Sequence, residues 1–204
     1  MPQRGPKAPD WDQLYEQAEA QAGYFDTQQA LGAGFSAPLL THHAQSGRIR
    51  RVLRGVFRLS HFPRSEHENL VTFWLWSHQK GVFSHETALM LHGLSDAMPS
   101  RLDMTLPAEW RTRRLKIPEE LIVHYADVPP TDRTWLGPVP LTTPARAILD
   151  CQREGAPREI VDLAFRQISH RGLLAPRDLR ALRRSLTRLP SGREQQQDPR
   201  VRNA

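Results

Sequence analysis

The apolar positions up to about residue 60 recur first at helical spacing and then in a strand-like pattern. Trp11, Leu14 and Ala18 lie three and four residues apart, as on the buried face of a helix, and Ser36 is a favourable N-cap residue. Residues 48–59 mix β-branched, aromatic and arginine side chains around Gly55, which is typical of a short hairpin. We therefore expect three helices and a basic hairpin, over residues 10–21, 28–33, 36–46 and 48–59.

The pattern from residue 66 onward predicts a second group of helices and strands. Residues 66–79 are apolar nearly all round, which indicates a buried helix. Apolar and polar side chains alternate over residues 102–106 and 121–125, as expected for strands with one buried face. Further helices are predicted over residues 86–92, 145–153, 157–170 and from 176 onward, with the arginine-rich segment 110–116 as a loop.

The order of the N-terminal elements, with two helices, a glycine turn, a third helix and a hairpin, is that of a winged helix-turn-helix. Ala30 provides a small side chain where two helices must cross closely, and Gly34 suits the turn that follows. We expect an α+β fold, with this module followed by a mixed α/β domain that ends in helices. The predicted boundaries are 1–9 for a disordered N-terminus, 10–62 for the winged helix-turn-helix, 66–186 for the mixed α/β domain and 187–204 for a disordered basic tail.

Charge is distributed unevenly along the chain. Its 28 Lys and Arg residues exceed its 22 Asp and Glu residues, and the sequence pI is near 10.2. Between Asp26 and Glu66 there is no acidic residue, whereas six arginines and three histidines fall in this interval. Because a carboxylate facing a duplex would repel its phosphates, this gap favours a DNA-facing module. The alternative that stays open is a helix–hairpin domain with a solvated basic face.

Helical spacing predicts which side chains of the third helix would meet DNA. Leu40 and Ala44 lie at i and i+4 and are expected to face the core. Thr41, His42 and Gln45 then point outward, where a recognition helix meets base edges. Since this helix has no Arg, Lys or Asn, the hairpin arginines would supply most of the phosphate affinity. The candidate DNA-binding residues are Ser36, Thr41, His42, Gln45, Arg48, Arg50, Arg51, Arg54 and Arg58.

The strongest candidates for chemistry are better interpreted as parts of a capped helix. Ser84 is expected to cap it, Glu86 to be favoured by the helix dipole and His92 to be a packed histidine. His85 and His92 have no obvious third ligand and lack the i, i+4 spacing of a zinc-protease helix. Cys151, the one cysteine, excludes an internal disulfide and is expected to be a small buried thiol. We therefore expect no catalytic residues, no metal and no cofactor, and predict that the protein is not an enzyme.

The chain also shows no sign of a membrane segment. No apolar run approaches the ~20 residues that span a bilayer, and Met1–Pro9 is polar and proline-rich rather than signal-like. We expect a cytoplasmic protein without a membrane partner.

Four segments resemble the AbiEi family of type IV antitoxins. They are Gln21–Ala30, Ser46–Leu59, Ser84–Leu94 and Val139–Asp150, in that order along the chain. The likeness extends over about residues 12–185. It implies an N-terminal winged helix-turn-helix that represses the protein's own operon, and an antitoxin-like C-terminal domain that counteracts a nucleotidyltransferase-like toxin encoded next door.

The sequence thus predicts an autorepressor and antitoxin whose partners are double-stranded operator DNA upstream of its own gene and a cognate nucleotidyltransferase-like toxin. One departure from the family keeps an alternative open. Where the family often has basic or hydroxyl residues early in the recognition helix, this chain has Ala37 and Pro38. The alternative is a protein-interaction module that has lost specific DNA binding and acts only on a partner protein.

Overall fold

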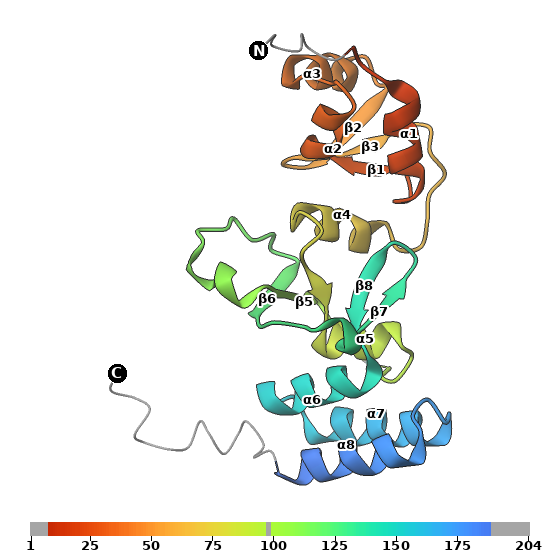
Figure 1. Ribbon diagram of the computed structural model, residues 1–204, viewed down its shortest axis with the longest axis vertical. Helices are drawn as coiled ribbons and strands as arrows, with labels where there is room; N and C mark the ends of the chain where they lie inside the picture. Colours follow the sequence, from red (N-terminus) through yellow and green to blue (C-terminus); the bar gives the residue numbers. More distant parts are fainter. Residues whose placement is uncertain (1–7, 97–98, 189–204) are drawn as a thin grey trace, which may run out of the picture. The chain divides into compact units, whose positions relative to one another are not determined.

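The computed structural model describes residues 8–96 and 99–188, and the chain divides into two compact units (Figure 1). The first comprises the described residues up to Gly81 together with Leu136–Val139, and the second comprises Val82–Trp135 and the described residues from Pro140 onward. The predictions for residues 1–7 and 189–204 lie outside the described residues. Helices and two sheets are present, so the expected mixed α+β fold is confirmed.

The first unit combines four helices with a three-stranded antiparallel sheet in the order β1-β3-β2. Its helices are α1 (Trp11–Glu19), α2 (Thr27–Gly32), α3 (Ala37–Gln45) and α4 (Glu68–Trp76), and its strands are β1 (Tyr24–Asp26), β2 (Ile49–Leu53) and β3 (Val56–Leu59). The predicted helices and hairpin are thus present. The sequence did not predict that β1 pairs with β3, which turns the hairpin into a sheet with β3 in its centre.

A single apolar core lies between α1, α2, α3 and one face of this sheet. Leu14, Phe25, Phe35 and Ile49 are among its fully buried members. Helix α4, which the sequence analysis placed in the second domain, groups with the first unit and packs on β1, β2 and β3. The sheet is therefore covered on both faces by helices of its own unit.

Local hydrogen bonds fix the path from β1 into α2. The backbone N–H of Gln29 donates to Asp26 Oδ1 at 2.8 Å, and the N–H of Asp26 donates to Gln29 Oε1 at 2.9 Å. This capping box satisfies two donors at the start of α2. The hydroxyl of Thr27 then donates to the carbonyl of Gly55 at 3.1 Å, which ties the start of α2 to the hairpin turn.

The second unit has a mixed five-stranded sheet in the order β6-β5-β4-β8-β7. The strands are β4 (Val82–Phe83), β5 (Leu102–Leu106), β6 (Leu121–Tyr125), β7 (Arg133–Leu136) and β8 (Val139–Thr142). The helices are α5 (His85–Leu91), α6 (Pro144–Glu154), α7 (Arg158–His170) and α8 (Pro176–Arg188), with short 3-10 turns η1 (Ala108–Thr112) and η2 (Pro130–Asp132). Helix α6 packs against α5, α7 and α8 (Figure 1). Among the described residues, no helix has both the length and the hydrophobicity to cross a membrane.

Two features of this unit differ from the sequence-based expectation. The segment 110–116 was predicted as a loop, but its first part belongs to η1. The pairing of β7 with β8 and the short strand β4 were not predicted, because these strands span four residues or fewer and lack a clear alternation. Parallel pairing of β4 with β8 and of β5 with β6 brings distant parts of the chain together, and this places the residues described below.

Candidate functional site

Helix α3 buries one face and exposes the other. Ser36 caps it as predicted, since Ser36 Oγ accepts a hydrogen bond from the N–H of Leu39 at 3.4 Å. Leu40 lies in the core, and Ala44 packs against its edge. Thr41, His42 and Gln45 are exposed, in agreement with their predicted outward orientation. The hydroxyl of Thr41 donates to the carbonyl of Ala37 at 3.1 Å, so its methyl group and oxygen lone pairs are what it presents to a ligand.

The hairpin β2–β3 carries exposed arginines beside α3. Helix α3 packs against β2, and the two elements are joined by Ser46, Gly47 and Arg48 (Figure 1). The exposed arginines of this region are Arg48, Arg50, Arg51 and Arg54. Arg48, Arg51 and Arg54, together with the exposed side chains of α3, form a surface that we call the basic face, and residues 27–65 contribute no carboxylate to it.

Strand register assigns Arg50 and Arg51 to opposite faces of the sheet. Arg51 pairs with Phe57, and Arg50 pairs with Arg58. Directly paired residues of an antiparallel sheet point to the same face. Phe57 belongs to the core beneath α1, α2 and α3, so Arg51 lies on the face that carries α3. Arg58 points to α4, so Arg50 lies on the opposite face.

The prediction that Arg58 binds DNA is wrong, because this side chain is buried inside the first unit. Only 2% of the side chain is exposed, and Arg58 Nη2 forms an ion pair with Glu68 Oε1 at 3.1 Å. The guanidinium also donates to the backbone carbonyls of Leu59, Phe62 and Pro63. With these donors occupied, Arg58 cannot reach a phosphate. It joins the sheet to the segment that leads into α4.

His43 is a buried residue of α3 that the sequence analysis did not single out. Its ring packs edge-on against Trp11 at 4.8 Å and Phe35 at 5.9 Å between ring centroids. Arg48 lies over the same indole, with its Cζ 6.0 Å from the ring centroid. Burial lowers the pKa of His43, and the charges of Arg48 and His42 lower it further. The base of the basic face is therefore a neutral histidine inside an aromatic cluster.

This environment predicts a pH-dependent stability. The pKa of His43 is lowered on folding, so the unfolded chain takes up a proton first as the pH falls. The contribution of neutral His43 to the free energy of unfolding is complete above the pKa of the unfolded chain, about 6.5, and is lost as the pH falls below that value. Replacing His43 with Phe should flatten the decrease in unfolding free energy between about pH 7.5 and about pH 5.5, as measured by urea unfolding. Parallel pH profiles for the two proteins would show that His43 does not carry this dependence.

In the second unit, the interpretation of Ser84 as a side-chain cap is wrong. Its hydroxyl makes no capping hydrogen bond to α5. Instead Ser84 Oγ lies 2.9 Å from His85 Nδ1 and 2.8 Å from Thr105 Oγ1. His85 itself has a φ of 50°, in the left-handed region. His92 is a packed histidine as expected, and its Nε2 donates to the carbonyl of Thr142 at 2.8 Å.

The partner of His85 is His124, on β6, rather than His92. The two rings stack with centroids 3.7 Å apart. His124 Nε2 lies 2.9 Å from Asp103 Oδ1, in a buried pair between β5 and β6. Burial lowers the pKa of His85 to about 3, helped by the charges of His124 and Arg146 and opposed by that of Asp103. Cys151 is a buried thiol as predicted, and burial raises its pKa.

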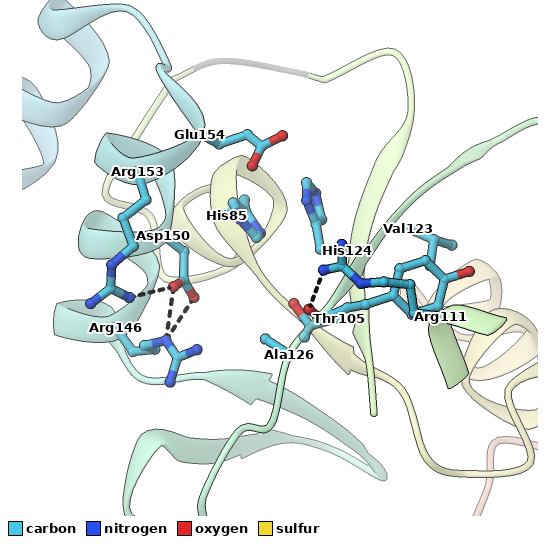
Figure 2. A pocket seen from close by; sticks show the side chains of 11 residues that line it. His85, Thr105, Arg111, Val123, His124, Ala126, Arg146, Asp150, Arg153 and Glu154 are labelled. Atoms are coloured by element: carbon cyan, nitrogen blue, oxygen red, sulfur yellow. Dashed lines mark hydrogen bonds and ion pairs between the residues drawn. The ribbon is translucent and has the colours of Figure 1, made fainter. Parts of the chain in front are cut away.

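These histidines border an open cavity of about 430 Å³ in the second unit (Figure 2). Arg146 and Asp150 of α6 form an ion pair in its wall, with Nε 2.8 Å from Oδ1. Burial on its own would lower the pKa of Arg146, but its bonds to Asp150 and Asp132 raise it. Arg146 is thus held as a cation with its donors directed to two carboxylates.

An exposed helix beside a basic hairpin is an arrangement typical of transcriptional regulators. Residues 12–60 match the model of a family described as transcriptional regulator, AbiEi antitoxin. The match confirms the resemblance to AbiEi antitoxins over these residues, which include the segments Gln21–Ala30 and Ser46–Leu59. The segments Ser84–Leu94 and Val139–Asp150 lie outside the matched range. No curated protein matches the chain.

Proposed function

We propose that the protein is a DNA-binding transcriptional repressor of its own operon, with the first unit acting as a winged helix-turn-helix. The observation that carries the proposal is the basic face, where exposed polar side chains of α3 lie beside exposed hairpin arginines and no carboxylate from residues 27–65 intervenes. Helix α3 would enter the major groove through Thr41, His42 and Gln45. The family match to transcriptional regulators supports this assignment.

The arginines of the hairpin would act unequally in such a complex. Arg51 lies on the sheet face that carries α3, and Arg48 lies in the short segment between α3 and β2. Both can contact phosphates on either side of the groove that α3 occupies. Arg50 points to the opposite face of the sheet and would lie further from the same duplex.

The test is fluorescence anisotropy with labelled DNA from upstream of the gene, at ~150 mM salt and with excess scrambled competitor, because low salt exaggerates phosphate binding. We expect retained binding with a preference for the native fragment. The double substitution of Thr41→Ala and Gln45→Ala should reduce that preference while leaving binding to scrambled DNA unchanged. The proposal is contradicted if excess scrambled competitor displaces the native fragment from the wild-type protein.

Arg51→Ala should make the slope of log affinity against log salt less negative by about 0.9, the value for one phosphate contact on duplex DNA. Arg50→Ala is the matched control, since it removes an equally exposed arginine from the neighbouring position of the same strand. We expect its salt slope to stay close to that of the wild type. Equal slopes for the Arg51→Ala variant and the wild type would remove the hairpin from the interface.

We further propose that the protein serves as an antitoxin against a nucleotidyltransferase-like toxin and does so without catalysis of its own. The support is the family description, which names an AbiEi antitoxin. Co-expression with the product of an adjacent nucleotidyltransferase-like gene tests this role. We expect growth to be restored by the chain, and restoration to persist in the Arg51→Ala variant, because repression and neutralisation would use different parts of the protein.

One observation favours the alternative of a protein-interaction module without specific DNA binding. Ala37 and Pro38 occupy the first turn of α3, where they offer no hydrogen-bond donor from a side chain. In that case the anisotropy experiment would show equal affinity for native and scrambled DNA, while neutralisation of the toxin would be retained.

A further inference from the structure

Three side chains with metal-binding atoms lie together in the second unit, although they come from three separate elements. His85 begins α5, His124 lies on β6 and Glu154 ends α6. One ligand atom from each lies within 4.8 Å of the other two. Figure 2 shows the carboxylate of Glu154 extending from α6 toward the two imidazole rings.

Hydrogen bonds leave one ring nitrogen of each histidine available to a ligand. His124 Nε2 faces Asp103 Oδ1 at 2.9 Å, so Nε2 carries the proton and Nδ1 is left with its lone pair. His85 Nδ1 lies 2.9 Å from Ser84 Oγ, and in the tautomer whose Nδ1–H donates to this oxygen the lone pair is on Nε2. A carboxylate or hydroxyl behind a ligating imidazole is the usual way in which proteins orient a metal-binding histidine.

Burial and access also suit a bound ion. The side chains of His124 and Asp103 are 13% and 9% exposed, so most of their surface is in contact with the protein. Glu154 is exposed, and among the interactions given for the described residues none involves its carboxylate. Two cavities, of about 430 and 390 Å³, each include His85, His124 and Glu154 in their lining. The cluster is thus open to solvent on the side of Glu154.

We propose that His85 Nε2, His124 Nδ1 and the Glu154 carboxylate bind a Zn²⁺ ion, with a fourth position open to water. Two imidazoles and one carboxylate form a ligand set that zinc uses where a coordination position stays open. Ligand atoms of a tetrahedral zinc site lie about 3.4 Å apart, so atoms that now lie within 4.8 Å of one another must approach by up to about 1.4 Å on binding. The nearly parallel imidazole rings, now 21° apart, must open for their in-plane lone pairs to converge on the ion.

Isothermal titration of the metal-free full-length protein with ZnCl₂ tests the proposal. We expect one Zn²⁺ per chain. Glu154→Gln and His124→Ala should each weaken binding by at least ~10-fold, since loss of even an outer-shell partner costs 10–100-fold. Glu154 is exposed, so its replacement leaves the fold intact and keeps the test valid if His124→Ala fails to fold. His170→Ala and Glu159→Gln are matched controls, because both residues are exposed on α7 and lie outside the cluster.

Spectroscopy gives a second readout that a surface histidine would not produce. Bound Co²⁺ should give the visible absorption of a tetrahedral ion, and Zn²⁺ should shift the ring resonances of His85 and His124 and not that of His170. The proposal is overturned if Glu154→Gln and the folded His124→Ala protein bind Zn²⁺ as the wild type does, if the controls lose binding to the same extent, or if the wild type binds no Zn²⁺.

Discussion

Replacing Arg58 with Ala is expected to lower the free energy of unfolding by about 3 kcal/mol, the cost of removing one partner of a buried ion pair. The change leaves Glu68 without its cation and leaves the carbonyls of Phe62 and Pro63 without the donor that now reaches them at 2.8 and 3.1 Å. Urea unfolding at neutral pH, followed by tryptophan fluorescence, measures the loss. A decrease below about 1 kcal/mol would mean that water replaces these bonds without penalty.

Two further variants separate this structural role from a role in DNA binding. Arg51→Ala removes an exposed arginine and should change stability by less than about 0.5 kcal/mol. Arg58→Lys keeps the charge but loses the planar fork, so it should be intermediate in stability. The folded Arg58→Lys variant should show the same slope of log DNA affinity against log salt as the wild type, because Arg58 does not reach the duplex. A reduced slope in the Arg58→Lys variant would place this residue at the interface after all.

The parts of the candidate site that the sequence predicted are those governed by local rules. Ser36 caps α3 because its side chain needs only the N–H three residues ahead. Leu40 is buried and Thr41 is exposed because helical periodicity alone separates them. The absence of acidic residues between Asp26 and Glu66 is likewise a property of the sequence itself.

Residues whose role depends on distant partners were not predictable in this way. In the sequence pattern Arg58 is indistinguishable from the other arginines of the basic hairpin. Its burial depends on the ion pair with Glu68 on α4. The one local signal was its alternation with the core residues Phe57 and Leu59, which places it on the other face of β3. That signal fixes the face of Arg58 but not the helix that covers that face.

The histidine cluster depends on pairing across the sheet. Parallel pairing of β5 with β6 sets Thr105 beside His124, and the hydroxyl of Thr105 in turn contacts Ser84, next to His85. No spacing along the chain encodes this, because the register of two parallel strands is set by the crossover between them. Spacing along the chain therefore groups His85 with His92, which lies close to it in the sequence, and does not predict that His124 is its neighbour.

Replacing Gly23 with Ala is expected to destabilise the first unit by about 3 kcal/mol, from a left-handed backbone and from overpacking together. Gly23 joins α1 to β1 with a φ of 86°, and a Cβ atom there would lie 2.4 Å from Phe62 Cγ. Because Cγ lies close to the backbone of Phe62, the ring cannot rotate away from the new methyl group. Urea unfolding measures the decrease, with Gly47→Ala as the matched control.

Gly47 separates the two contributions to this cost. It also has a left-handed backbone, with a φ of 76°, but no heavy atom lies within 4 Å of where its Cβ would be. Gly47→Ala should therefore cost only the backbone part, about 1 kcal/mol. In a Phe62→Gly background the added cost of Gly23→Ala should fall to the same value, because both the ring and the Cβ atom of residue 62, which would lie 2.4 and 2.6 Å from the new methyl group, are gone. If Gly23→Ala lowers the free energy of unfolding by the same amount with and without the Phe62 side chain, then contact with Phe62 is not the reason that position 23 requires glycine.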